Sequence, residues 1–576
     1  MYDRFPCSAV GTSDECLVGW AAICTALRDL QPAPHAIAVE CYPGTNEEEI
    51  IAGLSIGLPG AAIASTSQML RSPEAIEAMV TKVLGDDPVF GIMNSIRIED
   101  FFDPKKINDT RKSLENQSGP SICVGVGATL IFPEPDLLLY ADLARWEIQQ
   151  RQRRNELGNL GAANRNERPS LKYKRAFFVD WRAADRLKVR LLPKADLVLD
   201  TNSPGHPKAI SGEVFRRSLH AITRRPFRVV PFFDPGPWGG HWMEQVCNLP
   251  ADGSPNHAWC FDCVPEENSL LLGFGDKQIE IPALDLVLMY PKELLGEHVV
   301  DNYGAEFPIR FDFLDTMGGG NLSLQVHPLQ AYIQKHFGMQ YTQDESYYLL
   351  DAEPDACVYL GLKEDIDRTA MLRDLQAAQG GSSEFHAEAY VNRFPARKHD
   401  HFLIPAGTVH CSGKNSMVLE ISATPYIFTF KLWDWGRLGL DGLPRPIHLA
   451  HGAANIQWER TEKWVREALV NRITPLKSGV DWREERTGLH EFEFIETRRH
   501  WFTGVVSHDT QGTVHVLNLV EGDAVIVESP DRKFPPYTVH YAETFIVPAA
   551  VGKYTIRPSQ SKPEHEYATI LAYVRG

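Results

Sequence analysis

The sequence predicts a multidomain protein. An N-terminal α/β domain with an open, mostly parallel sheet precedes an all-β region of barrels or jelly rolls with a small helical insert. Three observations support this prediction. The chain has 576 residues, too many for one hydrophobic core. Apolar strand-like runs alternate with helical patterns over about the first 220 residues. From about residue 225 the predicted strands are short and Gly/Pro turns are frequent.

The N-terminal domain is predicted to span residues 1–224. The run "HAIAVECYPG" (35–44) is typical of a strand followed by a turn, and "TNEEEIIAGL" (45–54) is typical of a helix whose N-cap is Thr45. The β-rich run "SICVGVGATLI" (121–131) predicts another strand. Its "GVGATLI" part lacks the lysine and the spacing of a phosphate-binding P-loop, so no P-loop is predicted here.

The rest of the chain is predicted to contain three parts. A main β domain spans 225–450, and a helical segment spans 451–490, where "NIQWERTEKWVREALVNR" (455–472) has a helical pattern. A second, smaller β domain spans 491–576. Short strands separated by turn residues predict its barrel-like character.

Charge and composition narrow the function. A net charge of −17 disfavours nucleic acid as a partner, because binding phosphate backbones needs basic surface. The ten Cys are scattered, so a disulfide framework is not expected. No signal-peptide core or membrane-spanning apolar run is visible, and we therefore expect a cytoplasmic protein without membrane partners.

One strand carries an unusual pair of polar residues. In "NLSLQVHPLQ" (321–330), alternation places Ser323, Gln325 and His327 on one face and apolar residues on the other. Farther along, Glu345 opens a β run and His410 follows a Pro-Ala-Gly turn. An amide, two imidazoles and a carboxylate could bind a divalent ion. The alternative is that each His is a hydrogen-bonded core residue, and spacing alone does not decide between the two.

These motifs together resemble the type I mannose-6-phosphate isomerases, which are zinc cupins. The resemblance covers about residues 225–576 and keeps the family's order. It implies a catalytic cupin domain at 225–450 and a smaller cupin-like domain at 491–576. It also implies that Zn²⁺, or another divalent ion, is bound by Gln325, His327, Glu345 and His410. The motifs that carry the resemblance are "GPWGGHWM", "LSLQVHP", "DESYYLLDAEPDACVYLGLKE", "FLIPAGTVHCSGKNSMVLEIS" and "FTFKLWDWGR".

The resemblance further implies a reaction. Mannose 6-phosphate and fructose 6-phosphate would interconvert by proton transfer through a cis-enediol. Glu420 is expected near the proton-transfer role, with anchoring of a neighbouring side chain as the alternative. Lys431 and Arg437 are further catalytic candidates, although an ordinary surface arginine is the alternative for Arg437. Ser323 and Arg310 are expected to bind the substrate phosphate.

Two departures from the family pattern keep the substrate open. Arg310 stands where relatives usually have Lys, and Lys431 stands where they usually have Arg. The two side chains differ in reach and in hydrogen-bonding geometry. The alternatives are therefore an isomerase of another sugar or sugar phosphate, and a non-catalytic sugar-binding regulatory protein.

The N-terminal part faintly resembles uridine-kinase-like α/β domains. "YADLARWEIQQRQRR" (140–154) and "VDWRAADRLKVRLLPKADLVLD" (179–200) carry this likeness. It implies a degenerate nucleoside-kinase-like domain that binds a nucleotide or has a regulatory role. A docking domain without a ligand is the alternative.

Overall fold

The chain forms two compact units. The computed structural model describes residues 1–251, 253–423, 426, 428–488, 490–560 and 565–576. The α/β unit comprises Cys7–Ile222 and Glu266–Tyr290, and the β-rich unit comprises Met1–Pro6, Thr223–Pro265 and Pro291–Gly576. The predicted boundary at residue 224 thus lies close to the break between the units. Two segments, however, belong to the other unit than predicted. Met1–Pro6 belongs to the β-rich unit, and Glu266–Tyr290 belongs to the α/β unit.

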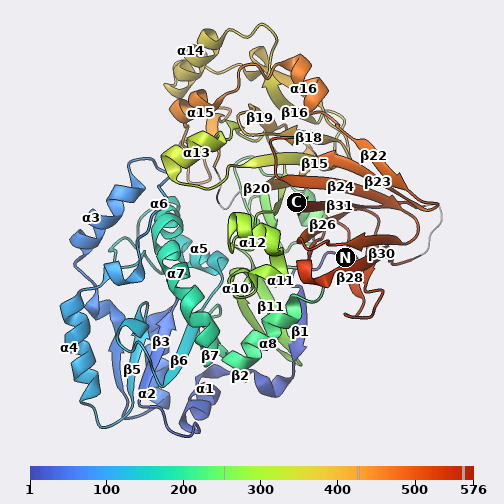
Figure 1. The fold of residues 1–576 in the computed structure, drawn as a ribbon. Coiled ribbons are helices and arrows are strands. Elements are labelled where there is room, and N and C mark those ends of the chain that lie inside the picture. The colour runs from blue at the N-terminus through green and yellow to red at the C-terminus, as the bar shows by residue number, and fades with distance from the viewer. Residues whose placement is uncertain (252, 424–425, 427, 489, 561–564) are drawn as a thin grey trace. The chain divides into compact units, whose positions relative to one another are not determined.

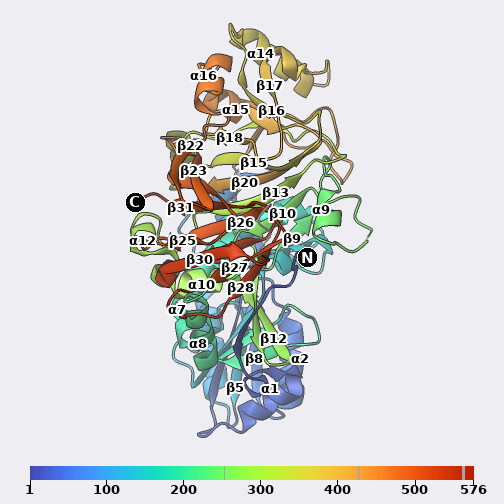
Figure 2. The ribbon, with the colours of Figure 1, turned by 90° about the vertical axis from the view of Figure 1, so that its right-hand side faces the viewer.

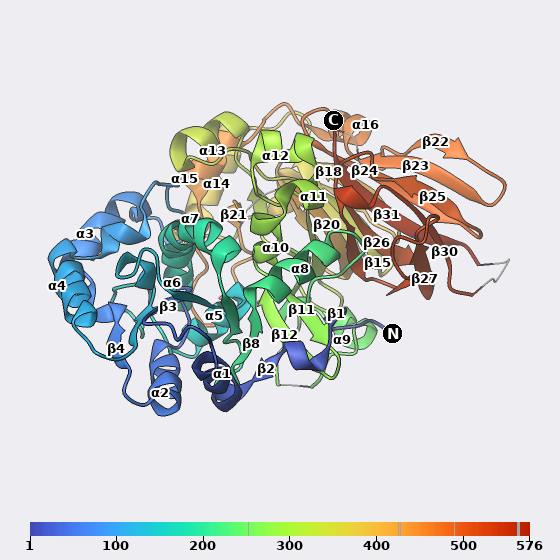
Figure 3. The same cartoon turned by 60° about the horizontal axis from the view of Figure 1, so that its bottom comes forward.

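A seven-stranded sheet forms the centre of the α/β unit (Figures 1 and 3), and five neighbouring strands of it are parallel. Two antiparallel strands extend one edge. Consecutive parallel strands lie on opposite sides of the interior strand β3, so the strand order reverses there. In spatial order the strands are β2 (Leu17–Val18), β8 (Lys208–Ser211), β7 (Leu197–Asp200), β6 (Leu137–Asp142), β3 (Ala36–Cys41), β5 (Ser121–Gly125) and β4 (Ala62–Ser65).

Capping residues set where helices of this unit begin. Asn46 caps α2 by accepting a hydrogen bond from the backbone N–H of Glu49 at 3.2 Å. The predicted cap, Thr45, is therefore wrong by one residue, because its hydroxyl bonds back to the Tyr42 carbonyl at 3.0 Å. The helices are α1 (Gly19–Arg28), α2 (Glu47–Gly57), α3 (Pro73–Leu84), α4 (Pro104–Glu115), α5 (Arg145–Arg153), α6 (Pro169–Arg175), α7 (Trp181–Leu191) and α8 (Gly212–Ile222).

Strand pairing explains why 266–290 belongs to the α/β unit rather than to the predicted main β domain. β11 (Ser269–Phe274) pairs in parallel with β1 (Cys7–Gly11) and antiparallel with β12 (Lys277–Pro282). The helix α10 (Ala283–Met289) follows. Because β1 and β11 are more than 250 positions apart in the chain, periodicity within either segment does not reveal the pairing.

A buried ion triad ties α10 to the α/β unit. Nζ of Lys188 lies 2.7 Å from Asp142 and 2.8 Å from Asp285, and the three side chains are at most 2% exposed. Removing one member would leave an unpaired buried charge, at a cost of about 3–5 kcal/mol.

Two antiparallel sheets, here named the first sheet pair, form the earlier part of the β-rich unit (Figure 1). The six-stranded sheet has the order β18 (His401–Ile404), β15 (Asp344–Ala352), β20 (Ser416–Ala423), β13 (Arg310–Asp315), β10 (Trp259–Cys263), β9 (Phe232–Asp234). The five-stranded sheet has the order β17 (Val391–Pro395), β16 (Cys357–Leu362), β19 (His410–Ser412), β14 (Leu324–Val326), β21 (Phe430–Trp433).

A second sheet pair follows, and Figure 2 shows its orange and red strands side by side. Its six-stranded sheet has the order β22 (Thr474–Ser478), β23 (Trp482–Gly488), β24 (Ile495–Phe502), β31 (Tyr567–Val574), β26 (His515–Glu521), β29 (Thr544–Val547). Its four-stranded sheet has the order β25 (Val506–Asp509), β30 (Lys553–Pro558), β27 (Ala524–Glu528), β28 (Tyr537–His540).

The predicted helical segment 451–490 is only partly helical. Its helices are α15 (Leu449–Asn455) and α16 (Glu462–Ala468), whereas residues 474–488 form β22 and β23. In β23, Glu484 stands opposite His500 of β24 and Glu485 stands opposite Arg499. Cross-strand pairs of opposite charge stabilise such a strand, although its sequence resembles a solvated helix face. The remaining helices of this unit are α9 (Trp242–Val246), α11 (Pro291–Leu295), α12 (Glu297–Tyr303), α13 (Gln330–Phe337) and α14 (Arg368–Gln379).

Candidate metal centre and adjoining cavity

Three side chains that can bind a metal ion meet inside the first sheet pair. His327 directly follows β14, Glu345 is the second residue of β15, and His410 is the first residue of β19. Their ligand atoms all lie within 4.8 Å of one another, and each residue is at most 1% exposed. Nε2 of His327 is 3.0 Å from Oε2 of Glu345, and Nε2 of His410 is 2.8 Å from its Oε1. Three of the four predicted metal ligands therefore lie together.

Backbone carbonyls fix the orientation of both imidazoles. Nδ1 of His327 is 2.8 Å from the carbonyl oxygen of Phe428, and Nδ1 of His410 is 2.9 Å from that of Thr408. Because a carbonyl oxygen only accepts, each Nδ1 carries the hydrogen and donates it. Each neutral ring then turns the lone pair of Nε2 toward the carboxylate of Glu345. Lone pairs and a carboxylate meeting at one buried point need a cation, which is either a metal ion or protons.

The charges of the cluster lead to the same conclusion. Burial opposes a charged imidazole, but the carboxylate of Glu345 outweighs it and raises the pKa of His327. Burial likewise opposes a charged Glu345, yet His327 and His410 outweigh it and hold the pKa of Glu345 well below its usual value. The amide of Gln343 donates a further hydrogen bond to Glu345 at 2.8 Å. Two imidazoles and an ionised carboxylate are a donor set that suits Zn²⁺.

Gln325, the fourth predicted ligand, lies beside the cluster. It pairs with His410 across β14 and β19, and its Nε2 is 3.2 Å from Nε2 of His410. A half-turn of the side-chain amide exchanges nitrogen for oxygen at this place. Gln325 is thus placed to offer a carbonyl oxygen to an ion held by the other three residues.

A glycine turn and a buried arginine position His410. Gly407 has φ +88°, and a Cβ there would lie 2.7 Å from Gln457, so a larger residue would be strained. Nη1 of Arg460 donates to the carbonyls of Pro405 (2.9 Å) and Ala406 (2.7 Å). It also donates to the Thr408 hydroxyl at 2.6 Å, and the Thr408 carbonyl accepts from His410. Arg460 therefore stabilises the turn whose Thr408 carbonyl orients the His410 imidazole. No pattern in the sequence indicated this role of Arg460.

A small cavity of about 90 Å³ adjoins the cluster through Gln325. Five of the predicted site residues line it, although they come from four strands and the short segment before β14. Asp312 and Arg445, which the sequence interpretation missed, line it as well. Asp312 stands two residues from Arg310 in strand β13, so alternation puts both on one face, a signal that could have identified it. The five predicted residues are Arg310, Ser323, Gln325, Glu420 and Lys431.

Glu420 lies on β20, directly opposite Asp312 on β13. Burial raises the pKa of Glu420 well above its ordinary value, and the carboxylates of Glu345 and Asp312 raise it further. A carboxyl group whose pKa is raised keeps its proton to a higher pH than an ordinary glutamate does, which suits proton transfer.

Lys431 lies on β21, opposite Gln325. Burial of its ammonium group, together with the nearby Arg445 and Arg437, lowers its pKa to about 7 and outweighs the attraction of Asp434. Lys431 is thus a cavity-lining group whose charge changes near neutral pH.

Arg437 does not line the cavity. It donates to Asp434 at 2.7 Å, and Asp434 in turn accepts a hydrogen bond of 2.9 Å from Ser323. Arg445 contacts both, at 3.0 Å from the Ser323 hydroxyl and 3.0 Å from the Asp434 carboxylate. The structure therefore places Arg437 one contact away from the cavity, on a carboxylate that it shares with Arg445.

The α/β unit has a separate cavity of about 200 Å³ near the carboxyl ends of β3 and β5. Gly44, Glu47 and Val126 are among its lining residues, and the Glu47 carboxylate accepts from the Val126 N–H at 3.2 Å. The first turn of α2 carries three glutamates. A phosphate would be repelled at this helix start, so the predicted nucleotide stays a prediction without support from the charge here.

Comparisons with known proteins find a family match in the N-terminal part and several mannose-6-phosphate isomerases. A sequence family described as Domain of unknown function (DUF8485) matches residues 19–224. Mannose-6-phosphate isomerase ManA of Bacillus subtilis is 25% identical over 232 residues, which are 40% of this chain and 67% of that protein. The mannose-6-phosphate isomerase of Streptococcus mutans is 25% identical over 214 residues, which are 37% of this chain and 61% of that protein.

A crystal structure of the mannose 6-phosphate isomerase from Bacillus subtilis is also similar. It matches 61% of this chain and 99% of its own with a TM-score of 0.50 at 17% identity, which shows a shared fold. The curated relatives confirm the predicted resemblance to the mannose-6-phosphate isomerase family. Among the helices that the structure describes, none is long and apolar enough to cross a membrane.

Proposed function

We propose that the β-rich unit is a metal-dependent aldose–ketose isomerase that interconverts mannose 6-phosphate and fructose 6-phosphate. The observation that carries this proposal is the meeting of His327, Glu345 and His410 beside a cavity lined by Glu420 and Lys431. The names of the curated relatives supply the substrate.

The proposed metal site consists of Gln325, His327, Glu345 and His410 in a cupin-type sandwich, and the proposed ion is Zn²⁺. When bound, such an ion supplies Lewis-acid stabilisation of negative charge on substrate oxygens. The neutral tautomers imposed by the Phe428 and Thr408 carbonyls favour its binding, because both Nε2 atoms are then free to coordinate.

Glu420 is the proposed proton carrier between C1 and C2 through a cis-enediol. Its carboxyl group lines the cavity, and its raised pKa favours the protonated form through which a proton carrier must pass. Lys431, Arg310 and Ser323 supply cationic and hydroxyl donors in the lining of the cavity, where they would bind the substrate phosphate. Arg437 is proposed to act as a positioning residue, because its contact is with Asp434 rather than with the cavity.

An isomerase of a different sugar phosphate is a second candidate. Two observations favour it. Arg310 and Lys431 replace the family's usual Lys and Arg, and the cavity, at about 90 Å³, is small. Guanidinium and ammonium groups hold a phosphate in different geometries, so the accepted sugar can differ while the chemistry stays the same.

A coupled assay on the full-length protein tests the proposal. Mannose 6-phosphate, glucose 6-phosphate and ribose 5-phosphate are offered separately before chelation, after chelation, and after return of Zn²⁺. We expect turnover of mannose 6-phosphate that the chelator abolishes and Zn²⁺ restores. Turnover of another sugar phosphate alone would favour the second candidate. Saturable binding without any turnover would overturn the proposal in favour of a sugar-binding regulatory protein.

A further inference from the structure

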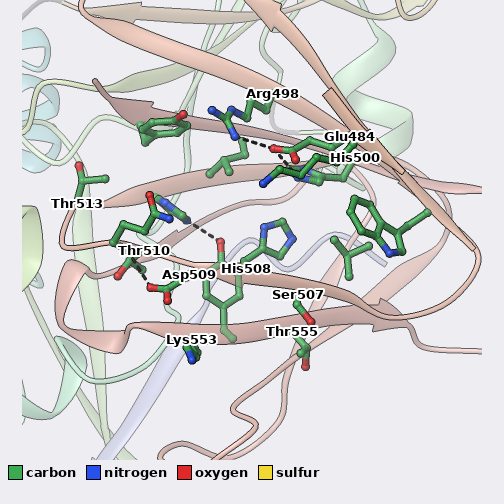
Figure 4. A pocket seen from close by; sticks show the side chains of 18 of the residues that line it. Glu484, Arg498, His500, Ser507, His508, Asp509, Thr510, Thr513, Lys553 and Thr555 are labelled. Atoms are coloured by element: carbon green, nitrogen blue, oxygen red, sulfur yellow. Dashed lines mark hydrogen bonds and ion pairs between the residues drawn. The ribbon is translucent and has the colours of Figure 1, made fainter. Parts of the chain in front are cut away.

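The second sheet pair has a large polar cavity that the proposed isomerase site does not use. Its volume is about 540 Å³, within the range of about 300–1,000 Å³ usual for small-molecule sites. Figure 4 shows His500 next to Glu484 and Arg498, with His508 beside it. Both sheets of the pair contribute to the lining.

Polar residues occupy positions of this sandwich where core residues are expected. On β24, alternation puts Arg498 and His500 on the same face as Phe502, which belongs to the hydrophobic core of the second sheet pair. On β26, His515 shares its face with the core residue Leu517. The inward faces of these strands thus carry apolar side chains at one end of the sandwich and polar side chains at the other end. Polar residues at core positions of a strand pattern indicate a function.

Two of the cavity's imidazoles have nitrogen atoms without a protein partner. Nδ1 of His500, a residue that is 4% exposed, and Nε2 of His508 are buried, and neither has a hydrogen-bond partner within the described part of the chain. Native proteins seldom bury polar atoms unpaired, so these two atoms call for a ligand or ordered water. His515 is occupied, because its Nδ1 lies 2.8 Å from the Tyr554 hydroxyl.

The charges of the cavity indicate a neutral ligand. Arg498 is paired with Glu484 at 2.8 Å and with Glu496 at 2.6 Å. Burial, with His500 and Arg498 nearby, lowers the pKa of His515 to about 3, so that ring is neutral. The remaining charged residues of the lining, Lys477, Asp509 and Lys553, are exposed to solvent. The described residues also do not form a His/Asp/Glu group tight enough for a metal ion here.

Aromatic rings complete the lining. Trp482, Tyr554 and Tyr573 lie beside the imidazoles, and Tyr554 stacks on His508 at 4.9 Å between ring centroids. A sugar ring has apolar C–H faces that pack on aromatic rings, and hydroxyls that both donate and accept hydrogen bonds. Neutral imidazoles and hydroxyl groups match those hydroxyls, because they too donate and accept.

We propose that this cavity is a second ligand site, and that it binds an uncharged hexose through His500 and His508. The site is separate from the proposed isomerase site, since the two share none of their lining residues. Its test therefore does not depend on the outcome of the isomerase assay.

Isothermal titration calorimetry of the full-length protein with D-mannose, D-glucose, D-galactose and D-fructose tests the proposal. The same titrations in the His410→Ala variant remove the contribution of the first sheet pair. We expect saturable binding of at least one hexose in both proteins. A lack of saturation up to 50 mM with all four sugars would overturn the proposal, as would binding that disappears with His410→Ala.

Variants locate the binding. His500→Phe keeps a ring of similar size but removes both nitrogens, and His508→Ala changes a half-buried residue that is easier to replace without unfolding. We expect each to weaken binding at least tenfold. His540→Ala is the matched control, because His540 lies on β28 of the same sheet pair but does not line the cavity. Equal affinity in His508→Ala and His540→Ala would place the ligand elsewhere and refute the proposal.

Discussion

The two sheet pairs of the β-rich unit use similar side chains in different ways. In the first pair, two imidazoles converge on one carboxylate, with ligand atoms within 4.8 Å of one another. In the second pair, three imidazoles surround a cavity of about 540 Å³, and the carboxylate beside them, Glu484, is already paired with Arg498 at 2.8 Å. Histidine content alone therefore does not distinguish a candidate metal centre from a cavity for a larger ligand. What distinguishes the two is whether the ligand atoms converge on one point.

Hydrogen bonding explains the difference. Carbonyl groups take the Nδ1 hydrogens of His327 and His410, so both Nε2 lone pairs face the same carboxylate. His500 Nδ1 and His508 Nε2 have no hydrogen-bond partner among the described residues, and the two rings lie 4.6 Å apart between centroids. The first arrangement concentrates negative charge for a cation, and the second leaves donors and acceptors for a neutral ligand.

Replacing His410 with Ala is expected to have the largest effect on this comparison. Loss of one imidazole from a three- or four-ligand site should release the metal and reduce isomerase activity by at least about a thousandfold, since the Lewis acid is lost. Metal analysis and the coupled assay measure both. His508→Ala should leave the metal content unchanged, and a metal content that falls with His508→Ala but not with His410→Ala would reverse the assignment of the two sheet pairs.

Glu420→Gln is expected to have the next largest effect. Removing a group that carries the proton should lower kcat by about 10²–10⁴-fold, while the metal content stays at the wild-type value. Steady-state kinetics on metal-loaded protein gives the answer. Full activity in this variant would support the alternative role of Glu420, in which it only anchors a neighbouring side chain.

Arg460→Met tests how far the first sheet pair depends on support from α16 and the residues before it. Without the guanidinium, the turn at 405–408 loses its donors and His410 loses its fixed orientation, so metal affinity should fall about 10–100-fold. Competition with a chromogenic chelator measures the affinity. Arg466→Met is the control, since its side chain is 60% exposed and pairs with Glu462 at 2.6 Å.

Lys431→Arg should give the smallest change, seen in the pH profile. The pKa of Lys431 is lowered to about 7, so its positive charge is present below that pH and is lost above it. If this charge binds the substrate phosphate, kcat/KM should decrease as the pH rises above about 7 in the wild type, because fewer molecules are cationic. Arginine stays charged, so the variant should lack this decrease. Identical profiles for the two proteins would assign the phosphate contact to other residues.

Local sequence patterns determined a good part of this protein. Alternation in "LSLQVHP" places Ser323, Gln325 and His327 on one face, because successive strand residues point to opposite sides. Ordered motifs made the family resemblance visible. These features depend on residues close together in the chain, so they can be predicted without a structure.

Tertiary structure alone decided the rest. Three contacts join segments whose sequence patterns do not indicate each other. They are the pairing of β1 with β11, the hydrogen bonds from Arg460 to the turn before His410, and the contact of Arg437 with Asp434. The cavity of the second sheet pair is of the same kind, because His500, His508 and His515 resemble isolated strand histidines until two sheets face each other. Periodicity fixes which side of a strand a residue occupies, whereas packing between distant strands fixes what it meets there.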